Sequence, residues 1–316
     1  MKKNLLICAV LMTAMIVSPL TAIDRQRTVK PQDKIQAEDT GIVSVMLSEN
    51  GKVEKMDERE YVIGALCAEM DLSCHEEALK AQAVACYTYM LYRKNNVDAE
   101  NFNGADLSDN PSECQGYLNI EARKKKWGDD YEKNEKYAEK IADSVLGKKI
   151  IYNGEPILAA YHELNSGTTE SASDVWGRDI PYLQQIGSAG DRLSTDYSKT
   201  VVMSLSEFMS CAIKIKGVEL SDDYNDWLGK SDKTESGYVK SIVLGGKTVS
   251  GNDFRKAFGL NSCNFTVSCE NEKFTIKTLG KGHMVGMSQY GADYMARQGS
   301  TYDEILRHYY KNTKIV

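Results

Sequence analysis

Histidine is scarce in this chain of 316 residues, which contains four of them. None of the four belongs to a His-x3-His pair, and no Cys-x2-Cys pair accompanies them. Zinc sites are commonly built from such closely spaced ligand pairs. We therefore expect no bound metal, and nothing in the sequence calls for another cofactor.

The chain also lacks an excess of positive charge. Its 39 Lys and Arg residues are outnumbered by 45 Asp and Glu residues, which gives a net charge of −6. Domains that bind nucleic acid usually present a clustered basic surface to the phosphates. The charge balance therefore predicts no nucleic-acid partner.

Cysteines are present, but not in the pattern of a disulfide-rich domain. Cys8 lies in an apolar N-terminal segment, which leaves seven others, an odd number spread thinly along the chain. Secreted domains held together by disulfides usually show an even and denser set. We expect most of the seven to be small buried hydrophobic residues. A disulfide between Cys263 and Cys269 is the alternative.

The N-terminus combines positive charge with a long apolar run. Lys2 and Lys3 precede the uncharged segment 5–23, whose length of about 19 residues approaches the roughly 20 that a membrane span needs. The lysines predict a cytoplasmic N-terminus. Leu20 occupies the outer small position of the candidate cleavage site, which disfavours cleavage. Residues 1–23 are therefore predicted to be a single-pass anchor, with a cleaved signal peptide as the alternative.

The rest of the chain is predicted to lie outside the cytoplasm and to mix helices with strands. Residues 24–42 are polar, without an apolar period, and predict a tether. The strand and helix patterns that follow do not alternate regularly, which indicates the α+β class. We expect a main domain of residues 43–191 plus 270–316 and a smaller inserted α+β domain of residues 192–269.

Capping patterns and turns place most of the expected elements. Asp57 with Glu60, and Ser73 with Glu76, form capping boxes that predict a helix to Met70 and a second, alanine-rich and buried helix to about Lys94. Asn-Gly and Gly-Gly pairs between apolar runs predict hairpins. Further patterns predict the hairpins 149–161 and 238–249, strands at 200–203, 265–267 and 274–276, and helices that begin after Ser204, at Asn252, after Ser288 and after Thr301.

Glu69 is the candidate for acid–base chemistry. At 3.6 residues per turn, Val62, Leu66 and Glu69 fall on one face of the first helix. Burial on an apolar face favours the protonated form of a carboxyl group, as a general acid near neutral pH requires. A half-exposed glutamate at a helix end is the alternative, because Asp71 follows closely.

Several ordered blocks of the sequence resemble the stage II sporulation protein D family. They extend over nearly the whole chain beyond the tether: 61–70 and 77–85, Tyr161-His162 with Thr169-Glu170 and 174–177, Gly282-His283 with 285–292, and 302–310. The resemblance implies a main α+β domain with a smaller inserted domain. It also places the family's catalytic glutamate at Glu69.

The same resemblance implies a lytic transglycosylase of septal peptidoglycan that acts during forespore engulfment. Its expected partners are glycan strands, stage II sporulation proteins P and M, and the membrane. In this chemistry the muramyl 6-hydroxyl attacks its own anomeric carbon, so a single carboxyl group can serve as acid and then as base. A glycan-binding enhancer of an amidase, which does not cut, and a septal scaffold are the competing interpretations.

Residues expected to contact substrate lie in the same blocks. Lys80 and Gln82 would face Glu69 if the two early helices pair, and Trp176 could stack on a sugar ring. The remaining candidates follow a strand or lie where a glycine-rich loop meets a helix: His162, Ser166, His283, Gln289 and Tyr290.

The chain departs from the family pattern at several positions. Residues 163–165 replace a hydroxyl-rich loop, Tyr87 replaces an arginine, and Met284 replaces a glycine. Some relatives bind zinc near the position of Cys114, but no histidine is close to it in this sequence. We therefore do not expect zinc there.

Overall fold

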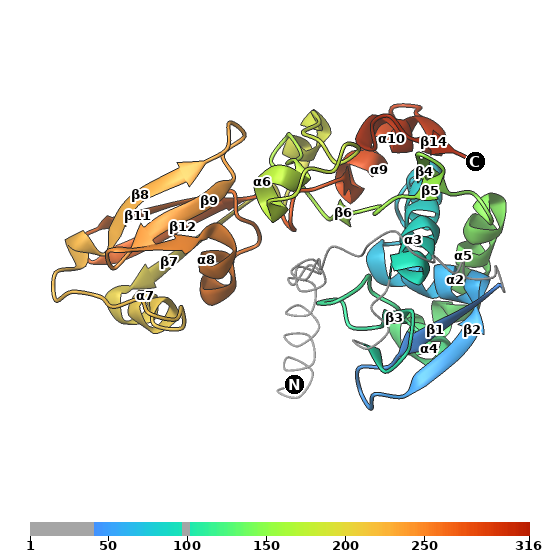
Figure 1. The fold of residues 1–316 in the computed structure, drawn as a ribbon, viewed down its shortest axis with the longest axis horizontal. Helices are drawn as coiled ribbons and strands as arrows, with labels where there is room; N and C mark the ends of the chain where they lie inside the picture. The colour runs from blue at the N-terminus through green and yellow to red at the C-terminus, as the bar shows by residue number, and fades with distance from the viewer. Residues whose placement is uncertain (1–40, 97–101) are drawn as a thin grey trace, which may run out of the picture. The chain divides into compact units, whose positions relative to one another are not determined.

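The computed structural model describes residues 41–96 and 102–316, so the predicted anchor and nearly all of the tether lie outside the described residues (Figure 1). Helices and short strands are mixed, and the predicted α+β class is correct. The chain divides into unit 1, residues 1–161 with 292–316, and unit 2, residues 162–291. The range 192–269 lies within unit 2, and its boundaries as an inserted domain stay a prediction.

Unit 1 is built around one long helix, α3 (Glu76–Asn96), which packs against α2, α5 and α10 (Figure 1). Ala78, Ala81 and Ala85 are fully buried on α3, as expected for a central helix whose small residues admit close neighbours. The other helices of unit 1 are α2 (Glu58–Glu69), α4 (Ile120–Trp127), the 3-10 turn η2 (Gly128–Asp130), α5 (Tyr131–Val145) and α10 (Tyr302–Tyr309).

One of the two early capping predictions is right about the helix start and the other is wrong. Asp57 caps α2 by accepting a hydrogen bond from the Arg59 amide at 2.8 Å. Ser73 does not cap α3, because the helix begins three residues later at Glu76, and the Ser73 amide instead donates to Asp71 at 2.8 Å. The His75 ring takes that place and accepts from the Glu77 amide at 3.3 Å.

Short strands complete unit 1. β1 (Ile42–Met46) pairs antiparallel with β2 (Val53–Asp57) and parallel with β3 (Leu107–Ser108). The predicted Asn-Gly hairpin joins β4 (Ile150–Tyr152) to β5 (Glu155–Pro156), and β14 (Lys314–Ile315) pairs with β4. Asn153 and Gly154 have φ of 52° and 90°, the positive values that a tight hairpin turn requires.

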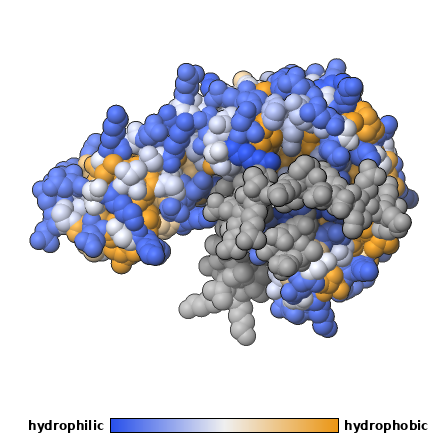
Figure 2. All heavy atoms as spheres, viewed as in Figure 1, coloured by the Kyte–Doolittle hydropathy of each residue, from blue (hydrophilic) through white to orange (hydrophobic). Residues whose placement is uncertain are grey.

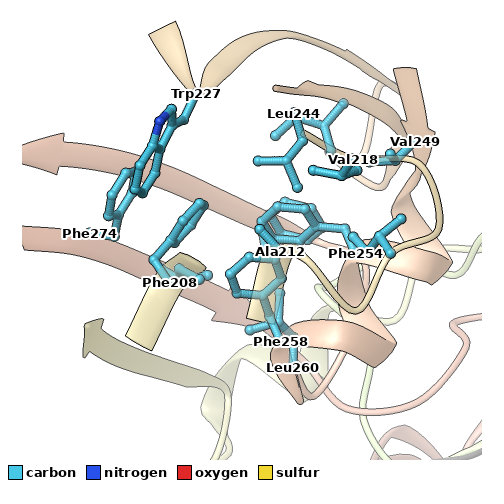
Figure 3. Packing of buried hydrophobic residues seen from close by; sticks show 14 of the residues in the cluster. Phe208, Ala212, Val218, Trp227, Leu244, Val249, Phe254, Phe258, Leu260 and Phe274 are labelled. Atoms are coloured by element: carbon cyan, nitrogen blue, oxygen red, sulfur yellow. The ribbon is translucent and has the colours of Figure 1, made fainter. Parts of the chain in front are cut away.

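Unit 2 contains a layered core of aromatic residues (Figure 3). Phe208 stacks on Phe274 with ring centroids 3.7 Å apart, and Trp227 lies parallel to Phe274. The core joins two sheets and two helices. One sheet contains β7 (Ser198–Ser204), β12 (Lys273–Leu279) and β11 (Phe265–Glu270), and the other contains β8 (Leu228–Lys233), β9 (Val239–Leu244) and β10 (Lys247–Ser250). The helices are α7 (Leu205–Ala212) and α8 (Gly251–Phe258), and unit 2 also contains the 3-10 turn η4 (Tyr224–Asp226).

The irregular segment 163–197 of unit 2 is held by buried polar contacts. Asp191 accepts hydrogen bonds from the Asn165 amide at 2.9 Å and from the hydroxyl groups of Ser188 and Ser288. This network connects the 3-10 turn η3 (Ala189–Leu193) with β13 (Met287–Ser288), after which α9 (Gln289–Arg297) begins. β13 pairs with β6 (Tyr161–His162), and α6 (Ala172–Trp176) lies between β6 and η3 in the chain.

The seven cysteines of the described ranges are all free, so Cys263 and Cys269 are not paired. Four of them are buried, as expected for small hydrophobic residues, and the Cys263 thiol donates to Asn252 Oδ1 at 3.2 Å. Within residues 41–96 and 102–316, no helix has the length and apolar character of a membrane span.

Candidate functional site

Glu69 is the last residue of α2 and is half-buried, below the fully buried Leu66 of the same helix face. Its Oε1 accepts a hydrogen bond from the backbone amide of Gly116. A Cβ atom at position 116 would lie 3.0 Å from that oxygen and 3.2 Å from Ala68 Cβ. The absence of a side chain at Gly116 therefore lets the backbone approach the carboxyl group closely.

Two neutral polar side chains, those of Cys86 and Tyr161, lie close to this carboxyl. Burial, followed by the charge of Glu69, raises the pKa of Cys86 to about 12. Burial also raises the pKa of Tyr161 well above its ordinary value, with Cys86 and Glu69 adding to the effect. The Tyr161 hydroxyl donates to Gln115 Oε1 at 3.0 Å, and Gln115 Nε2 donates at 3.1 Å to Tyr61 Oη and to the Cys86 carbonyl. Cys86 and Tyr161 are thus uncharged near neutral pH.

Gln82 and Lys80 have different surroundings although both lie on α3. Gln82 is fully buried and donates to Cys86 Sγ at 3.3 Å, which places it in the polar network beside Glu69. Lys80 pairs with Glu76 at 2.9 Å and with Glu77 at 2.8 Å. These ion pairs hold Lys80 at the first turn of α3, and its contact with substrate stays a prediction.

In unit 2 the structure brings His162, His283 and Trp176 together. The His283 ring centroid lies 5.7 Å from that of His162 and 5.4 Å from that of Trp176. The backbone of Val285 joins the two histidines: its carbonyl lies 3.1 Å from His162 Nδ1, and its amide donates to His283 Nδ1 at 3.1 Å.

The buried ring of His162 is neutral. Burial lowers the pKa of His162 to about 4, so at neutral pH Nδ1 carries the proton that it donates to Val285 and Nε2 is left as an acceptor. Among the residues that the structure describes, this Nε2 and the indole Nε1 of Trp176 are buried and have no hydrogen-bond partner. The cluster therefore has an acceptor and a donor available for a polar group.

The other predicted substrate residues of unit 2 lie near this cluster in the chain but differ in their contacts. Ser166 is buried, and its carbonyl accepts from Tyr197 Oη at 2.9 Å. Gln289 is buried at the start of α9, and the amide of Tyr290 donates to the Glu163 carbonyl at 3.0 Å. Glu163 itself pairs with Lys281 at 2.6 Å.

Two of the altered positions have a visible structural consequence. Met284 has a φ of 70°, a conformation that glycine adopts far more readily, and its carbonyl accepts from the Glu170 amide at 2.7 Å. The hydroxyl of Tyr87 donates to Glu58 Oε2 at 3.4 Å, so a neutral group contacts an acid that Lys94 already pairs.

No metal cluster is found within the described ranges: no three His, Cys, Asp or Glu side chains there are arranged to hold an ion. Cys114 Sγ instead accepts from the Ser108 amide at 3.4 Å. Asp174, in the block 174–177, is the acid that we would consider first if the reaction needed a second carboxyl group. It pairs with Lys240 at 2.6 Å, and this hydrogen bond lowers the pKa of Asp174.

Comparison with known proteins agrees with the blocks noted in the sequence. The family model described as "Stage II sporulation protein" matches residues 48–149, which include Glu69 and Gly116. Stage II sporulation protein D of Bacillus subtilis is 35% identical over 303 residues, covering 96% of this chain and 86% of that protein. The protein of the same name from Bacillus amyloliquefaciens is 36% identical over 274 residues, covering 86% and 78%.

This chain belongs to the stage II sporulation protein D family. A more distant relative, named "Amidase enhancer" in Bacillus subtilis, is 28% identical over 307 residues, covering 80% of this chain and 40% of that protein. Relatives of this chain therefore carry names that refer to different functions.

Three residues around Glu69 were not predicted as site residues: Gly116, Gln115 and Tyr161. Gly116 is 47 residues from Glu69 in sequence, and a lone glycine carries no signal of a contact at that distance. Tyr161 precedes His162 within one of the quoted blocks, so the resemblance could have suggested it. Gln115 reaches the site only through its hydrogen bonds to Tyr161 and Cys86.

Proposed function

We propose that this protein is a lytic transglycosylase that cleaves the bond between N-acetylmuramic acid and N-acetylglucosamine in septal glycan strands during forespore engulfment. The observation that carries the proposal is the environment of Glu69, a half-buried carboxyl group that receives a backbone hydrogen bond from Gly116 and lies near the neutral side chains of Cys86 and Tyr161. A carboxyl in such surroundings can exist in both protonation states, as a group that first gives and then takes a proton must.

In the proposed reaction, Glu69 protonates the departing glycosidic oxygen and becomes a carboxylate. The carboxylate then removes the proton from the muramyl 6-hydroxyl as that oxygen bonds to the anomeric carbon, so the acid is regenerated. One product fragment carries a new hydroxyl group on N-acetylglucosamine, formed from the protonated glycosidic oxygen. The other fragment carries a 1,6-anhydromuramyl end. Because the nucleophile belongs to the substrate, a second carboxyl group is not required, in contrast to ordinary glycosidases.

The acids closest to Glu69 in sequence are engaged in other contacts, which agrees with a single-carboxyl mechanism. Asp71 accepts hydrogen bonds from the side chain and the backbone amide of Ser73, and these two hydrogen bonds lower the pKa of Asp71. Glu76 pairs with Lys80 and Lys140. Glu77 pairs with Lys80.

We also propose that the protein works outside the cytoplasm, anchored by residues 1–23, with stage II sporulation proteins P and M as partners. Gln82, Ser166, His162, Trp176, His283, Gln289 and Tyr290 are proposed to contact the glycan, together with Lys80. The neutral acceptor of His162 and the indole N–H of Trp176 suit the uncharged hydroxyl and acetamido groups of a sugar.

A second candidate function is a glycan-binding module that stimulates an amidase without cutting glycan itself. The relative named "Amidase enhancer" favours it. The two functions differ in one observable, the release of new glycan ends by the purified protein.

The test is the Glu69→Gln variant of the full chain in mild detergent, assayed on purified glycan strands. Gln keeps the side-chain shape but cannot transfer a proton, so cleavage should fall by roughly 10²–10⁴-fold with unchanged folding. The matched control is Glu54→Gln, an exposed residue of β2, which should retain full activity. Equal activity of the Glu69→Gln variant and the wild type would refute the assignment of Glu69.

A further inference from the structure

A lysine-lined groove lies in unit 2, apart from the residues proposed for catalysis. It has a volume of about 480 Å³ and is lined by the residues after α7, by β10 and by the first two turns of α8. Four exposed lysines contribute to it, namely Lys214, Lys216, Lys247 and Lys256, and we call it the lysine groove. Asp253 is the one acid in its lining, so the groove is strongly positive in a chain of net negative charge.

Packing contacts maintain the shape of the lysine groove. Lys247 Nζ donates to the Lys216 carbonyl, which ties β10 to the turn after α7. Gly217 makes this contact possible, because a Cβ there would lie 2.8 Å from Lys247 Nζ, and its φ of 75° suits glycine. Ser250 caps α8, and its hydroxyl donates to Asp253 Oδ2 at 2.7 Å, which engages the single acid.

Exposed hydrophobic residues adjoin the lysines. Ile213, next to Lys214 in the chain, is 62% exposed, and Met209 is 43% exposed. The Ile213 amide donates to the Met209 carbonyl at 3.0 Å, so the two side chains are one helical turn apart on the same face. Figure 2 shows hydrophobic residues at the surface of unit 2 on the side that carries α7.

We propose that the lysine groove binds the phosphate groups of anionic phospholipids and that unit 2 thereby docks on a membrane surface. Lysines supply the attraction to an anionic surface, and apolar side chains beside them enter the acyl boundary, as in other interfacial segments. A soluble phosphate polymer would use the lysines equally but would leave Ile213 and Met209 in water. The exposed apolar pair therefore favours lipid.

Hydrogen exchange of the full chain in nanodiscs tests the proposal locally, whatever the N-terminal segment contributes to binding. Discs of phosphatidylcholine alone are compared with discs that also contain phosphatidylglycerol. Each lysine near an anionic surface strengthens membrane binding by roughly fivefold. If amide exchange requires release from the membrane, segments 209–217 and 247–257 should therefore exchange at least roughly fivefold more slowly on the anionic discs. Equal exchange on both discs would overturn the proposal.

Variants and a soluble competitor complete the experiment. Lys214→Glu with Lys256→Glu should abolish the lipid-dependent protection, whereas Lys199→Glu with Lys230→Glu, an equal charge change at exposed sites that do not line the groove, should keep it. Unchanged exchange in the Phe208 core would show that the variants fold. If polyphosphate added to phosphatidylcholine discs protects both segments as well as phosphatidylglycerol does, the ligand is a soluble polyanion and the membrane proposal is wrong.

Discussion

At the scale of single residues, two opposing influences act on Glu69. The residue ends α2, where the helix dipole is negative and disfavours another negative charge. The Gly116 amide donates to Oε1 and favours the charged carboxylate. The same hydrogen bond holds the carboxyl group in place at the end of α2.

Replacing Gly116 by Ala tests this arrangement. The added Cβ would lie 3.0 Å from Glu69 Oε1, so the carboxyl group must move by a few tenths of an ångström. Catalysis depends on such positioning, and we expect kcat to fall by roughly 10- to 100-fold with a small change in KM. Glycan-release kinetics measure both constants. Gly187→Ala, at a position of ordinary φ with no atom within 4 Å of the added Cβ, serves as the control.

Buried His162 should make stability depend on pH. Its folded pKa of about 4 lies below the ordinary 6.5, so the unfolded chain binds the proton first as the pH falls. Neutral His162 contributes to the free energy of unfolding above pH 6.5. This contribution falls by about 3 kcal/mol as the pH falls toward 4. Urea unfolding followed by tryptophan fluorescence at several pH values measures this loss.

The His162→Gln variant isolates that contribution. Burial raises the pKa of Glu170 and of Asp191, whose effects on stability therefore have the opposite sign. The difference in the free energy of unfolding between wild type and His162→Gln should narrow as the pH falls from 7 to 4. A constant difference between wild type and His162→Gln over this range would contradict the neutral, buried state of His162.

At the scale of helices, Arg123 connects three elements of unit 1. Its side chain is fully buried, and its guanidinium pairs with Glu60 of α2 at 2.8 Å and with Glu135 of α5 at 2.7 Å. It also donates to the Leu118 carbonyl at 2.7 Å. These contacts attach the polar helix α4 to the helix that carries Glu69.

Removing Arg123 should destabilise unit 1 strongly. The Arg123→Ala variant leaves Glu60 and Glu135 without their buried partner, a loss typically worth about 3–5 kcal/mol of the free energy of unfolding. Lys125→Ala, on the exposed side of the same helix, should change stability by less than about 0.5 kcal/mol. Denaturant unfolding of both variants provides the comparison, and similar stability of the two would contradict the role given to Arg123.

Helices with strong local signals could be predicted from the sequence. Ser204 with Glu207 and Thr301 with Glu304 form the capping boxes expected of them, and Gly259 ends α8 with a φ of 62°. Such caps depend on residues within one turn of each other, so the pattern alone defines them.

Other elements depend on distant contacts and were not predicted. Five of the eight residues of α4 are charged, so it has no apolar stripe, and Arg123 attaches it to α2 and α5 through Glu60 and Glu135. The two-residue strand β3 likewise exists only because it pairs with β1, over 60 residues earlier. The Gly116 contact with Glu69 is hidden from the sequence for the same reason.

At the scale of the whole molecule, membership of the stage II sporulation protein D family and the surroundings of Glu69 support one account. Unit 1 carries the proposed acid–base residue, and unit 2 carries the histidine–tryptophan cluster and the lysine groove. In the proposed mechanism a single carboxyl group of the protein acts as acid and then as base, and the substrate supplies the nucleophile. The structure of the cleavage product therefore distinguishes this mechanism from hydrolysis.

Mass spectrometry of glycan fragments released in ¹⁸O-labelled water shows directly whether the nucleophile is the muramyl 6-hydroxyl or water. An internal nucleophile gives 1,6-anhydromuramyl ends with no ¹⁸O incorporated at the cut, and this is the result that we predict. Reducing ends with one ¹⁸O atom per cut would show that water is the nucleophile, as in hydrolases with two carboxyl groups. That outcome would contradict the account and would make Asp174 the first residue to examine as the second acid.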